Sequence, residues 1–260
     1  MFRYSIKSNL IHPLVYNLDI DTPEATIAHS CIIREKPFLK KIYEKWYSSI
    51  SNSLPLNISG PVIEIGSGGG FINEIIPGLL SSEIFQIPGV DVVLDGAKLP
   101  FKNASLRGIV MIDVFHHIPC VKHFLSEAVR CVMEGGVIVM IEPWNTCWSR
   151  FVYKYLHHEL FDSDIKDWNF RKGGPLSQAN SALPWIVFDR DREKFIQEFP
   201  EWKIKEIELH SPFCYLLSGG VSFRSPMPGC LFRMCQRIED ALKPWMNSWA
   251  MFTKIVLLRK

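Results

Sequence analysis

The sequence has 260 residues, of which 47% are hydrophobic and 22% charged, and its formal net charge is +2. This length and apolar content suit one large domain, and the small net charge creates no strong field that would favour nucleic acid as a partner. The seven cysteines are odd in number and form no CxxC pair, which argues against a disulfide framework or zinc site and favours a reduced, cytoplasmic protein.

The N-terminal segment begins with MFRYSIKSNLIHP, in which a lysine, a histidine and a proline interrupt the apolar residues. It therefore lacks the form of a signal peptide, and no apolar run in the chain approaches the roughly 20 residues of a membrane span. Next, residues 21–24 read DTPE, a capping residue followed by an early proline and an acid. They predict one helix that runs to about Ser49, and residues 1–60 are expected to form a helical cap over a binding cleft.

Residues 62–71 read VIEIGSGGGF and carry the strongest functional signal in the chain. Residues 62–65 predict a short buried strand, and the glycines after it let backbone approach a ligand closely. A helix is expected to begin near Phe71, with its first amides facing the same crevice. The turn lacks the third glycine of the dinucleotide fingerprint, and no Lys-Ser/Thr pair follows it as in a P-loop.

Strand-like and helix-like segments alternate from this turn to Pro143. The pattern predicts a short helix over 73–80, strands over 83–86, 91–94, 108–112 and 137–141, and a helix over 121–132. Such alternation is typical of βαβ units and a mostly parallel sheet. Further along, the sequence predicts a helix over 194–199, a strand over 202–209, a helix over 231–242 and a closing strand over 252–258.

Three segments, taken in order, resemble the class I S-adenosylmethionine (SAM)-dependent methyltransferases. They are the glycine turn, VDVVLDGAKLPFKNASLRGIVMIDVFHHI (90–118) and RCVMEGGVIVMIEP (130–143), and they are most similar to the type 11-like branch that includes small-molecule and quinone methyltransferases. The resemblance implies an α/β, Rossmann-like, mostly parallel seven-stranded sheet with helices on both faces and an antiparallel last strand. It also implies a SAM-binding core over 61–143, with a substrate-side insertion and the C-terminal strands of the same domain over 144–260.

The same resemblance assigns the first two acidic positions. Glu64 would support the glycine turn and the aminoacyl end of SAM, while Gly66, Ser67 and Gly68 would let the turn approach the cofactor. Glu83 is the candidate for both ribose hydroxyls, since one carboxylate accepts two donors. Two alternatives remain for these positions: Glu83 is a plain surface acid and the residue at position 91 takes the ribose role, or Glu64 only caps amides of the turn.

The later cofactor positions follow the third and fourth predicted strands. Asp95, with Gly96 and Ala97 beside it, would accept a hydrogen bond from the adenine amino group and offer an amide to the ring. Asp113 would lie at the mouth of the crevice, with Val114 providing backbone and apolar contact to SAM.

Two groups of histidines are candidates for catalysis. His117 and His116 follow Asp113, and in the family the histidine of this turn is structural or lines the cofactor pocket; a base is needed only if the acceptor must lose a proton. His157, His158 and Glu159 are a second candidate base, which we interpret instead as solvated helix surface. No metal site is expected there, because adjacent residues on a helix point about 100° apart.

The segment after Pro143 is the expected location of the acceptor pocket. Its candidate wall is aromatic (Trp144, Trp148, Phe151, Tyr153, Tyr155 and Trp168), and residues 171–185 are expected to form a lid with hinge glycines. The apolar stretch 213–245 is compatible with peripheral membrane contact, a dimer contact or a helical hairpin over the core.

The expected activity is methyl transfer from SAM to an O, N or C nucleophile of a small or lipid-linked acceptor. The alternatives are a SAM-binding regulatory module without catalysis and an NAD(P)-dependent oxidoreductase. The sequence does not identify the acceptor or the oligomeric state.

Overall fold

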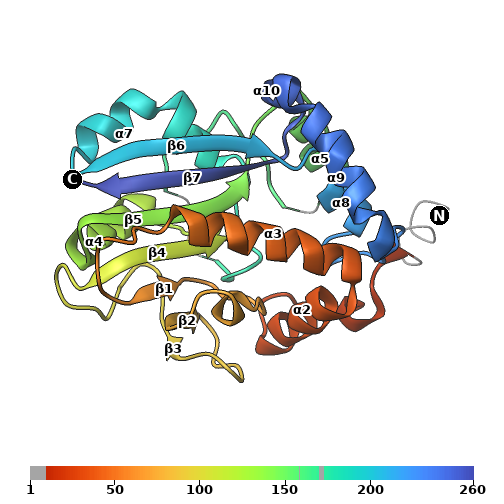
Figure 1. Ribbon diagram of the computed structural model, residues 1–260, viewed down its shortest axis with the longest axis horizontal. Coiled ribbons are helices and arrows are strands. Elements are labelled where there is room, and N and C mark those ends of the chain that lie inside the picture. The colour runs from red at the N-terminus through yellow and green to blue at the C-terminus, as the bar shows by residue number, and fades with distance from the viewer. Residues whose placement is uncertain (1–9, 158, 170–172) are drawn as a thin grey trace.

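The computed structural model describes residues 10–157, 159–169 and 173–260 (Figure 1). Residues 1–9, His158 and positions 171 and 172 of the expected lid lie outside the described residues. Seven strands form one sheet in the order β3-β2-β1-β4-β5-β7-β6. Their bounds are β1 Val62–Glu64, β2 Leu79–Glu83, β3 Val92–Val93, β4 Leu106–Ile112, β5 Val132–Pro143, β6 Trp202–His210 and β7 Phe252–Arg259.

The strand directions confirm the predicted fold class. The pairings among β1 to β5 are parallel, whereas β7 pairs antiparallel with both β5 and β6. In Figure 1, β7 accordingly runs toward the C-terminus at the left. The carboxyl ends of β1, β4 and β5 therefore lie at the right, beside the helices labelled α2, α5 and α8.

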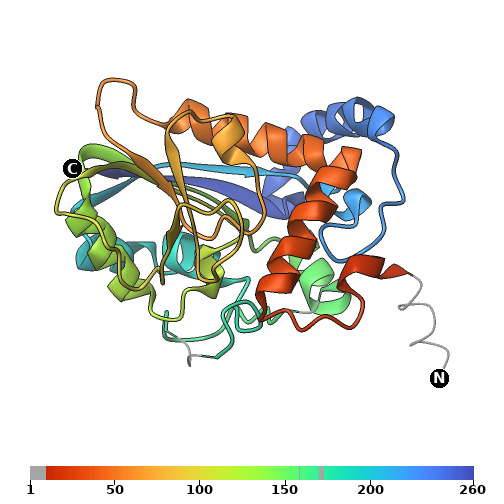
Figure 2. The same cartoon turned by 90° about the horizontal axis from the view of Figure 1, so that it is seen from below.

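Each face of the sheet has its own apolar core, because successive residues of a strand point to opposite faces. Val110 packs in the cluster that contains α3 (Pro37–Ser53), whereas its neighbours Ile109 and Met111 pack in the cluster that contains α4 (Val121–Cys131). Figure 2 shows α3 on one side of the sheet and α4 on the other. The predicted arrangement of helices on both faces is thus present.

The single N-terminal helix predicted to run to Ser49 is wrong, since the chain forms α2 (Pro23–Glu35) and α3. Lys36 between them is extended, with φ −94° and ψ 100°, because a residue before proline is excluded from the helical region. The Lys36 ammonium is buried and donates to the carbonyls of Gly220 (2.5 Å) and Phe223 (2.8 Å). Burial lowers the pKa of Lys36 to about 8.

The helix predicted over 73–80 is also wrong. A three-residue 3₁₀ turn, η2 (Ile72–Glu74), follows the glycine turn, and β2 begins at Leu79. Pro77 has no amide to continue a helix, and Gly78 adopts a left-handed φ of +74°. Because β2 begins earlier than predicted, Glu83 is its last residue and lies at the carboxyl end of the sheet.

The remaining predicted helices are present with shifted bounds. They are α7 (Arg192–Glu198) and α9 (Phe232–Ala241), and further short elements lie between the strands: η1 Pro13–Val15, η3 Phe115–His117, α5 Cys147–Leu156, α6 Leu183–Trp185, the π-helical η4 Ile186–Arg190, α8 Cys214–Ser218, η5 Gly229–Leu231, η6 Lys243–Trp245 and α10 Met246–Trp249. Within the part of the chain that the structure describes, none of the helices is long and apolar enough to span a membrane.

Candidate active site

A cavity of about 400 Å³ opens at the carboxyl ends of the parallel strands, where open α/β sheets bind their ligands. The glycine turn and the ends of β1, β2 and β4 line one part of it. Helices α2, α3, α5 and α8 and the segment 173–178 line the rest. Of the residues predicted to bind the cofactor, all line this cavity except Ala97.

The glycine turn is held by hydrogen bonds from its own amides. Ser67 N donates to the carbonyl of Ser82 (2.8 Å), and Gly68 N donates to Glu83 Oε2 (2.8 Å). Gly66 has a φ of +65°, and a Cβ there would lie 2.6 Å from Cγ2 of Val114. Position 66 therefore requires glycine both for its backbone conformation and for the close approach of the turn that follows β4.

Two carboxylates meet beside this turn. Glu64 and Glu83 are both 4% exposed and line the cavity. Burial raises the pKa of Glu64 to about 8, and the nearby Glu83 adds to the rise. Burial also raises the pKa of Glu83, while hydrogen bonds from the amides of Ile84 and Gly68 act in the opposite direction. Asp91, the alternative to Glu83, instead accepts hydrogen bonds from the amide and hydroxyl of Ser81.

The third-strand positions form a turn at the edge of the cavity. Asp95 is exposed, and its Oδ1 accepts a hydrogen bond from the amide of Ala97 (2.9 Å). Gly96 lines the cavity beside it, whereas Ala97 turns away from the cavity lining. The acid and glycine of this predicted trio are thus placed to meet a ligand.

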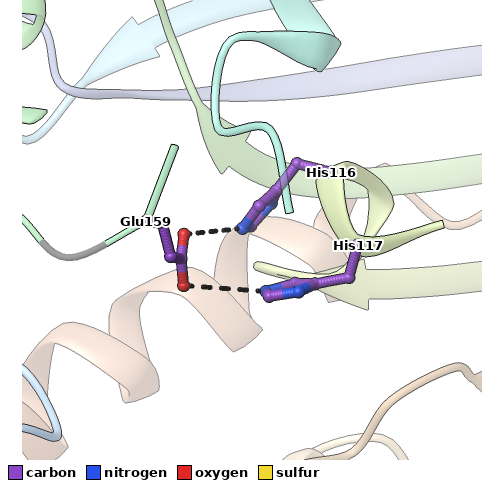
Figure 3. Close-up of side chains that lie close together, drawn as sticks. All are labelled: His116, His117 and Glu159. Atoms are coloured by element: carbon purple, nitrogen blue, oxygen red, sulfur yellow. Dashed lines mark ion pairs between the residues drawn. The ribbon is translucent and has the colours of Figure 1, made fainter. Parts of the chain in front are cut away.

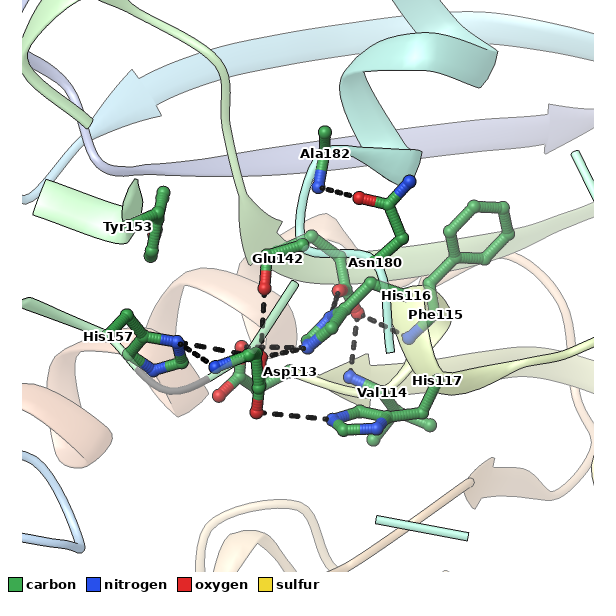
Figure 4. A network of polar contacts seen from close by, with 12 residues as sticks. Asp113, Val114, Phe115, His116, His117, Glu142, Tyr153, His157, Asn180 and Ala182 are labelled. Carbon is green, nitrogen blue, oxygen red and sulfur yellow. Dashed lines mark hydrogen bonds and ion pairs between the residues drawn. The ribbon is translucent and has the colours of Figure 1, made fainter. Parts of the chain in front are cut away.

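The turn after β4 is organised by Glu142, a fully buried acid near the end of β5 (Figure 4). Its Oε1 accepts hydrogen bonds from the amides of Val114 (2.9 Å) and Phe115 (2.8 Å). Its Oε2 lies 2.7 Å from Nδ1 of His116. Glu142 thereby fixes Asp113 at a left-handed φ of +61° on the cavity wall. Glu142 is not among the site residues predicted from the sequence, although an acid at a strand end is the same signal that Glu64 gives.

The pKa values of Asp113 and His116, both in the turn after β4, are shifted by different causes. The side chain of Asp113 is 37% exposed, toward the cavity, yet burial deep in the protein raises its pKa to about 7. Burial alone would lower the pKa of His116, but the neighbouring carboxylates of Glu142 and Glu159 raise it well above its ordinary value.

The interpretation of His157 and Glu159 as solvated helix surface is wrong. Helix α5 ends at Leu156, so His157 is its C-cap and Glu159 lies in the following loop. The Glu159 side chain is 14% exposed and faces the two histidines of η3 (Figure 3). Its Oε2 lies 3.3 Å from Nε2 of His116, and its Oε1 lies 3.8 Å from Nε2 of His117. His158 of the same predicted group lies outside the described residues.

The aromatic wall of the cavity differs from the predicted one. Of the six aromatic residues proposed between positions 144 and 168, only Tyr153 lines the cavity. Trp144 and Trp168 are buried in the core on the α4 side, and the other three stack in an outer cluster with Trp249 or with each other. The wall is completed by tyrosines from other elements, Tyr43 and Tyr47 of α3 and Tyr215 of α8.

Two loops close the cavity opposite the sheet. Residues 173–178 of the expected lid line it, and the amides of Leu176 (2.8 Å) and Ser177 (2.9 Å) donate to Asp21 Oδ1. The segment 219–223, held by Lys36, lines the other side. Both loops are thus tied to the N-terminal segment rather than to the sheet.

Comparison with known proteins adds the family. Residues 63–140 match the family model described as a methyltransferase domain. The chain therefore contains a methyltransferase domain. Its domain implies SAM as the cofactor, and residues 63–140 include the glycine turn and the ends of β1, β2 and β4. No curated protein sequence matches the chain significantly.

Solved structures share the methyltransferase fold. A methyltransferase from Haloferax volcanii, determined in complex with its Trm112 activator, is 11% identical, with a TM-score of 0.50 over 91% of this chain and 95% of that one. Geranyl diphosphate C-methyltransferase from Streptomyces coelicolor A3(2), determined with S-adenosyl-L-homocysteine, is 11% identical, with a TM-score of 0.50 over 84% of this chain and 77% of that one. A geranyl diphosphate methyltransferase in complex with SAM is also 11% identical, with a TM-score of 0.50 over 89% and 90%. At this identity the similarities show the fold alone.

Much of this methyltransferase's cavity lies outside the matched domain. Tyr153, Glu159 and Tyr215 of the cavity lining follow residue 140, and Tyr43 precedes residue 63. The part of the cavity opposite the glycine turn is therefore built largely from residues outside the matched domain.

Proposed function

We propose that the protein transfers a methyl group from SAM to an O, N or C nucleophile of a small or lipid-linked acceptor. The observation that carries the proposal is the convergence of Glu64, Glu83 and Asp113, from the ends of three neighbouring strands, on one cavity beside the glycine turn. The acceptor's methylated form and S-adenosyl-L-homocysteine are the products. Methyl transfer requires mainly alignment of the two reactants and exclusion of water.

We place SAM along the glycine turn. Each Glu83 oxygen accepts one backbone amide and keeps a further lone pair for a ribose hydroxyl. Glu64 would face the aminoacyl end and Asp95 the adenine, while Asp113 would lie near the sulfonium. The excess of carboxylates suits a cofactor that carries positive charge.

A nicotinamide dinucleotide fits the same wall poorly. Its pyrophosphate would need a helix N-terminus after the glycine turn, but the chain provides only the three-residue η2 there. The carboxylates of Glu64 and Glu83 would also repel the phosphates.

The acceptor would lie between the sulfonium and the tyrosine wall. Burial raises the pKa values of Tyr43, Tyr153 and Tyr215 above the ordinary range, so their hydroxyls are neutral at physiological pH. Tyr153 donates its hydrogen to the carbonyl of Met251 (2.9 Å). A mixed wall of aromatic rings and neutral hydroxyls suits a small, partly apolar acceptor.

Calorimetric titration of the whole protein with S-adenosyl-L-homocysteine, SAM and NADH tests the cofactor. We expect heat and a micromolar dissociation constant, about −8 kcal/mol, for the two SAM-type ligands and none for NADH. The proposal would be rejected if neither SAM nor S-adenosyl-L-homocysteine binds, or if NADH binds more tightly than both. Binding without transfer of labelled methyl to any member of a broad acceptor panel would instead favour a regulatory SAM-binding module.

Gly66→Ala is expected to weaken SAM binding at least 10-fold. The alanine would sit at a φ of +65° with its Cβ against Val114, so the turn must move away from the cofactor. Forcing a left-handed conformation costs about 1–2 kcal/mol by itself. Gly78→Ala is the matched control, because Gly78 also has a positive φ (+74°) but has no atom within 4 Å of the added Cβ. Equal losses of affinity in both variants, measured by the same titration, would contradict this account.

We also propose that the protein contacts a membrane surface through residues 213–245. Met234 and Ile238 on α9 are about half exposed, and Arg233 and Arg237 lie in the same shallow groove. Amphipathic helices of this kind bind anionic lipid surfaces, and co-sedimentation with anionic vesicles measures such binding directly.

A further inference from the structure

Two histidines and a glutamate from separate parts of the chain converge beside the proposed cofactor position. His116 and His117 come from the turn after β4, and Glu159 comes from the loop after α5. Each oxygen of the Glu159 carboxylate faces one imidazole, at 3.3 Å for His116 Nε2 and 3.8 Å for His117 Nε2 (Figure 3). The three ligand atoms lie within 4.8 Å of one another.

Glu142 fixes the orientation of the His116 ring through its contact with Nδ1, on the side of the ring away from Glu159. Because Glu142 accepts two backbone amides and lies 2.7 Å from Nδ1 of His116, we assign the Nδ1 proton to this contact. Nε2 is then the nitrogen that faces Glu159. It is fully buried and makes no hydrogen bond of acceptable geometry. A buried polar atom without a hydrogen bond requires an explanation.

A shared cation explains this geometry better than an ion pair. Ligands at about 2.1 Å from a tetrahedral ion lie about 3.4 Å apart. Nε2 of His116 lies 3.3 Å from one Glu159 oxygen, and Nε2 of His117 lies 3.8 Å from the other. A proton on His116 would pair it with Glu159 but would not explain why His117 faces the second oxygen of the same carboxylate. A carboxylate behind a metal-binding histidine, in the position of Glu142, is a usual companion of metal sites.

We propose that Nε2 of His116, Nε2 of His117 and the carboxylate of Glu159 bind one divalent transition-metal ion. Imidazole and carboxylate ligands suit ions such as Zn²⁺, Fe²⁺ and Co²⁺ better than Ca²⁺. His117 and Glu159 line the cavity, so the site is open to a ligand from that side. Asp113, whose Oδ1 is 3.9 Å from Nε2 of His116, lies next to it. This proposal departs from the expectation, drawn from the sequence, that the chain has no metal site.

If the protein is a methyltransferase as proposed, the metal site also indicates which class of acceptor it methylates. Such an ion binds an oxygen atom and makes it more acidic, which favours a hydroxyl-bearing acceptor. In the transfer, the acceptor oxygen forms a bond to the methyl carbon and the carbon–sulfur bond breaks, with its electron pair remaining on sulfur. The hydroxyl proton passes to solvent, and the products are the methyl ether and S-adenosyl-L-homocysteine.

Equilibrium dialysis of chelator-treated, full-length protein against Co²⁺ tests the site, with metal content and the visible absorption spectrum as readouts. We expect one Co²⁺ per chain with visible ligand-field bands and without the intense near-ultraviolet band that cysteine ligation would add. His117→Gln and Glu159→Gln should each weaken Co²⁺ binding at least 10-fold. His123→Gln is the control, since His123 is an exposed histidine on α4, and it should bind like the wild type.

Folding and cofactor binding are checked for each variant by circular dichroism and by titration with S-adenosyl-L-homocysteine. A folded wild type that binds no Co²⁺, or folded H117Q and E159Q variants that bind it as tightly as the wild type, would overturn the metal site. If the wild type binds S-adenosyl-L-homocysteine but no Co²⁺, only the metal site is wrong. If it binds Co²⁺ through His117 and Glu159 but neither SAM-type ligand, only the proposed function is wrong.

Discussion

Replacing Glu142 by alanine is expected to lower the free energy of unfolding by about 3–5 kcal/mol. The carboxylate is fully buried and is the acceptor for the amides of Val114 and Phe115 and the partner of His116. Its removal leaves two buried N–H groups and a buried imidazole without an acceptor. Urea unfolding followed by circular dichroism measures the loss, and SAM affinity should fall with it, because Asp113 and Val114 lose their anchor.

Two further variants separate the charge of Glu142 from its packing. Glu142→Gln keeps an oxygen for the two amides but removes the second carboxyl oxygen that faces His116, so a smaller loss of about 1–3 kcal/mol is expected. Glu239→Ala is the control for amide capping, since the buried Glu239 accepts hydrogen bonds from the amides of Phe213 and Cys214 without a histidine partner. If E142A were no more destabilising than E239A, the network around His116 would contribute nothing beyond capping.

The parts of the site that the sequence predicts correctly are set by local pattern. A short apolar run that ends in an acid gave the positions of Glu64 and Asp113, because a parallel strand delivers its last residues to the carboxyl edge of the sheet. Glu142 carries the same signal at the end of β5 and could have been found by the same reasoning. Its role as an anchor for the turn after β4 could not, because that contact joins residues 28 positions apart.

The errors have two physical origins. The first is the effect of proline on helices. Pro37 divides the N-terminal helix into α2 and α3, and Pro77 with Gly78 leaves only η2 after the glycine turn. Both signals are local and were readable. The position of Glu159 belongs to the second kind, since no periodicity marks the loop after α5 and only tertiary contacts bring it to His116 and His117.

The same distinction explains why the aromatic wall was misplaced. Position in the chain after β5 was used as the guide to the acceptor pocket, but Trp144 and Trp168 fill the core. The cavity instead takes two tyrosines from α3 and one each from α5 and α8. Sequence composition reports that aromatic residues are abundant, whereas which of them face a cavity depends on how distant helices pack.

Glu64→Gln is expected to stabilise the cofactor-free protein in alkaline solution and to weaken cofactor binding. The pKa of Glu64 is raised from 4.5 to about 8 in the folded protein, so the folded state binds its proton more tightly than the unfolded state does. The stability contributed by this proton is complete below pH 4.5 and is lost as the pH rises to about 8. Glutamine has no proton to lose, so above pH 8 the variant should be more stable than the wild type by roughly 3–5 kcal/mol.

Cofactor binding should reverse this preference, because the proposed position of SAM brings positive charge to Glu64 and favours its ionised form. At pH 7 Glu64 alone should therefore contribute close to one released proton as the wild type binds SAM. Titrations in buffers of different ionisation enthalpy measure that number. In the E64Q variant the proton release should fall by close to one proton, leaving only what Asp113 and Glu83 contribute, and the affinity should fall at least 10-fold.

Glu44→Gln provides the comparison for both measurements, because Glu44 is a partly exposed acid on α3 that does not line the cavity. It should change neither the pH dependence of stability nor the proton release. A wild type whose binding enthalpy is independent of the buffer, together with an E64Q variant of unchanged affinity, would separate Glu64 from the cofactor. In that case the buried carboxyl would serve the glycine turn alone, and the rise in stability above pH 8 would be the only consequence of its replacement.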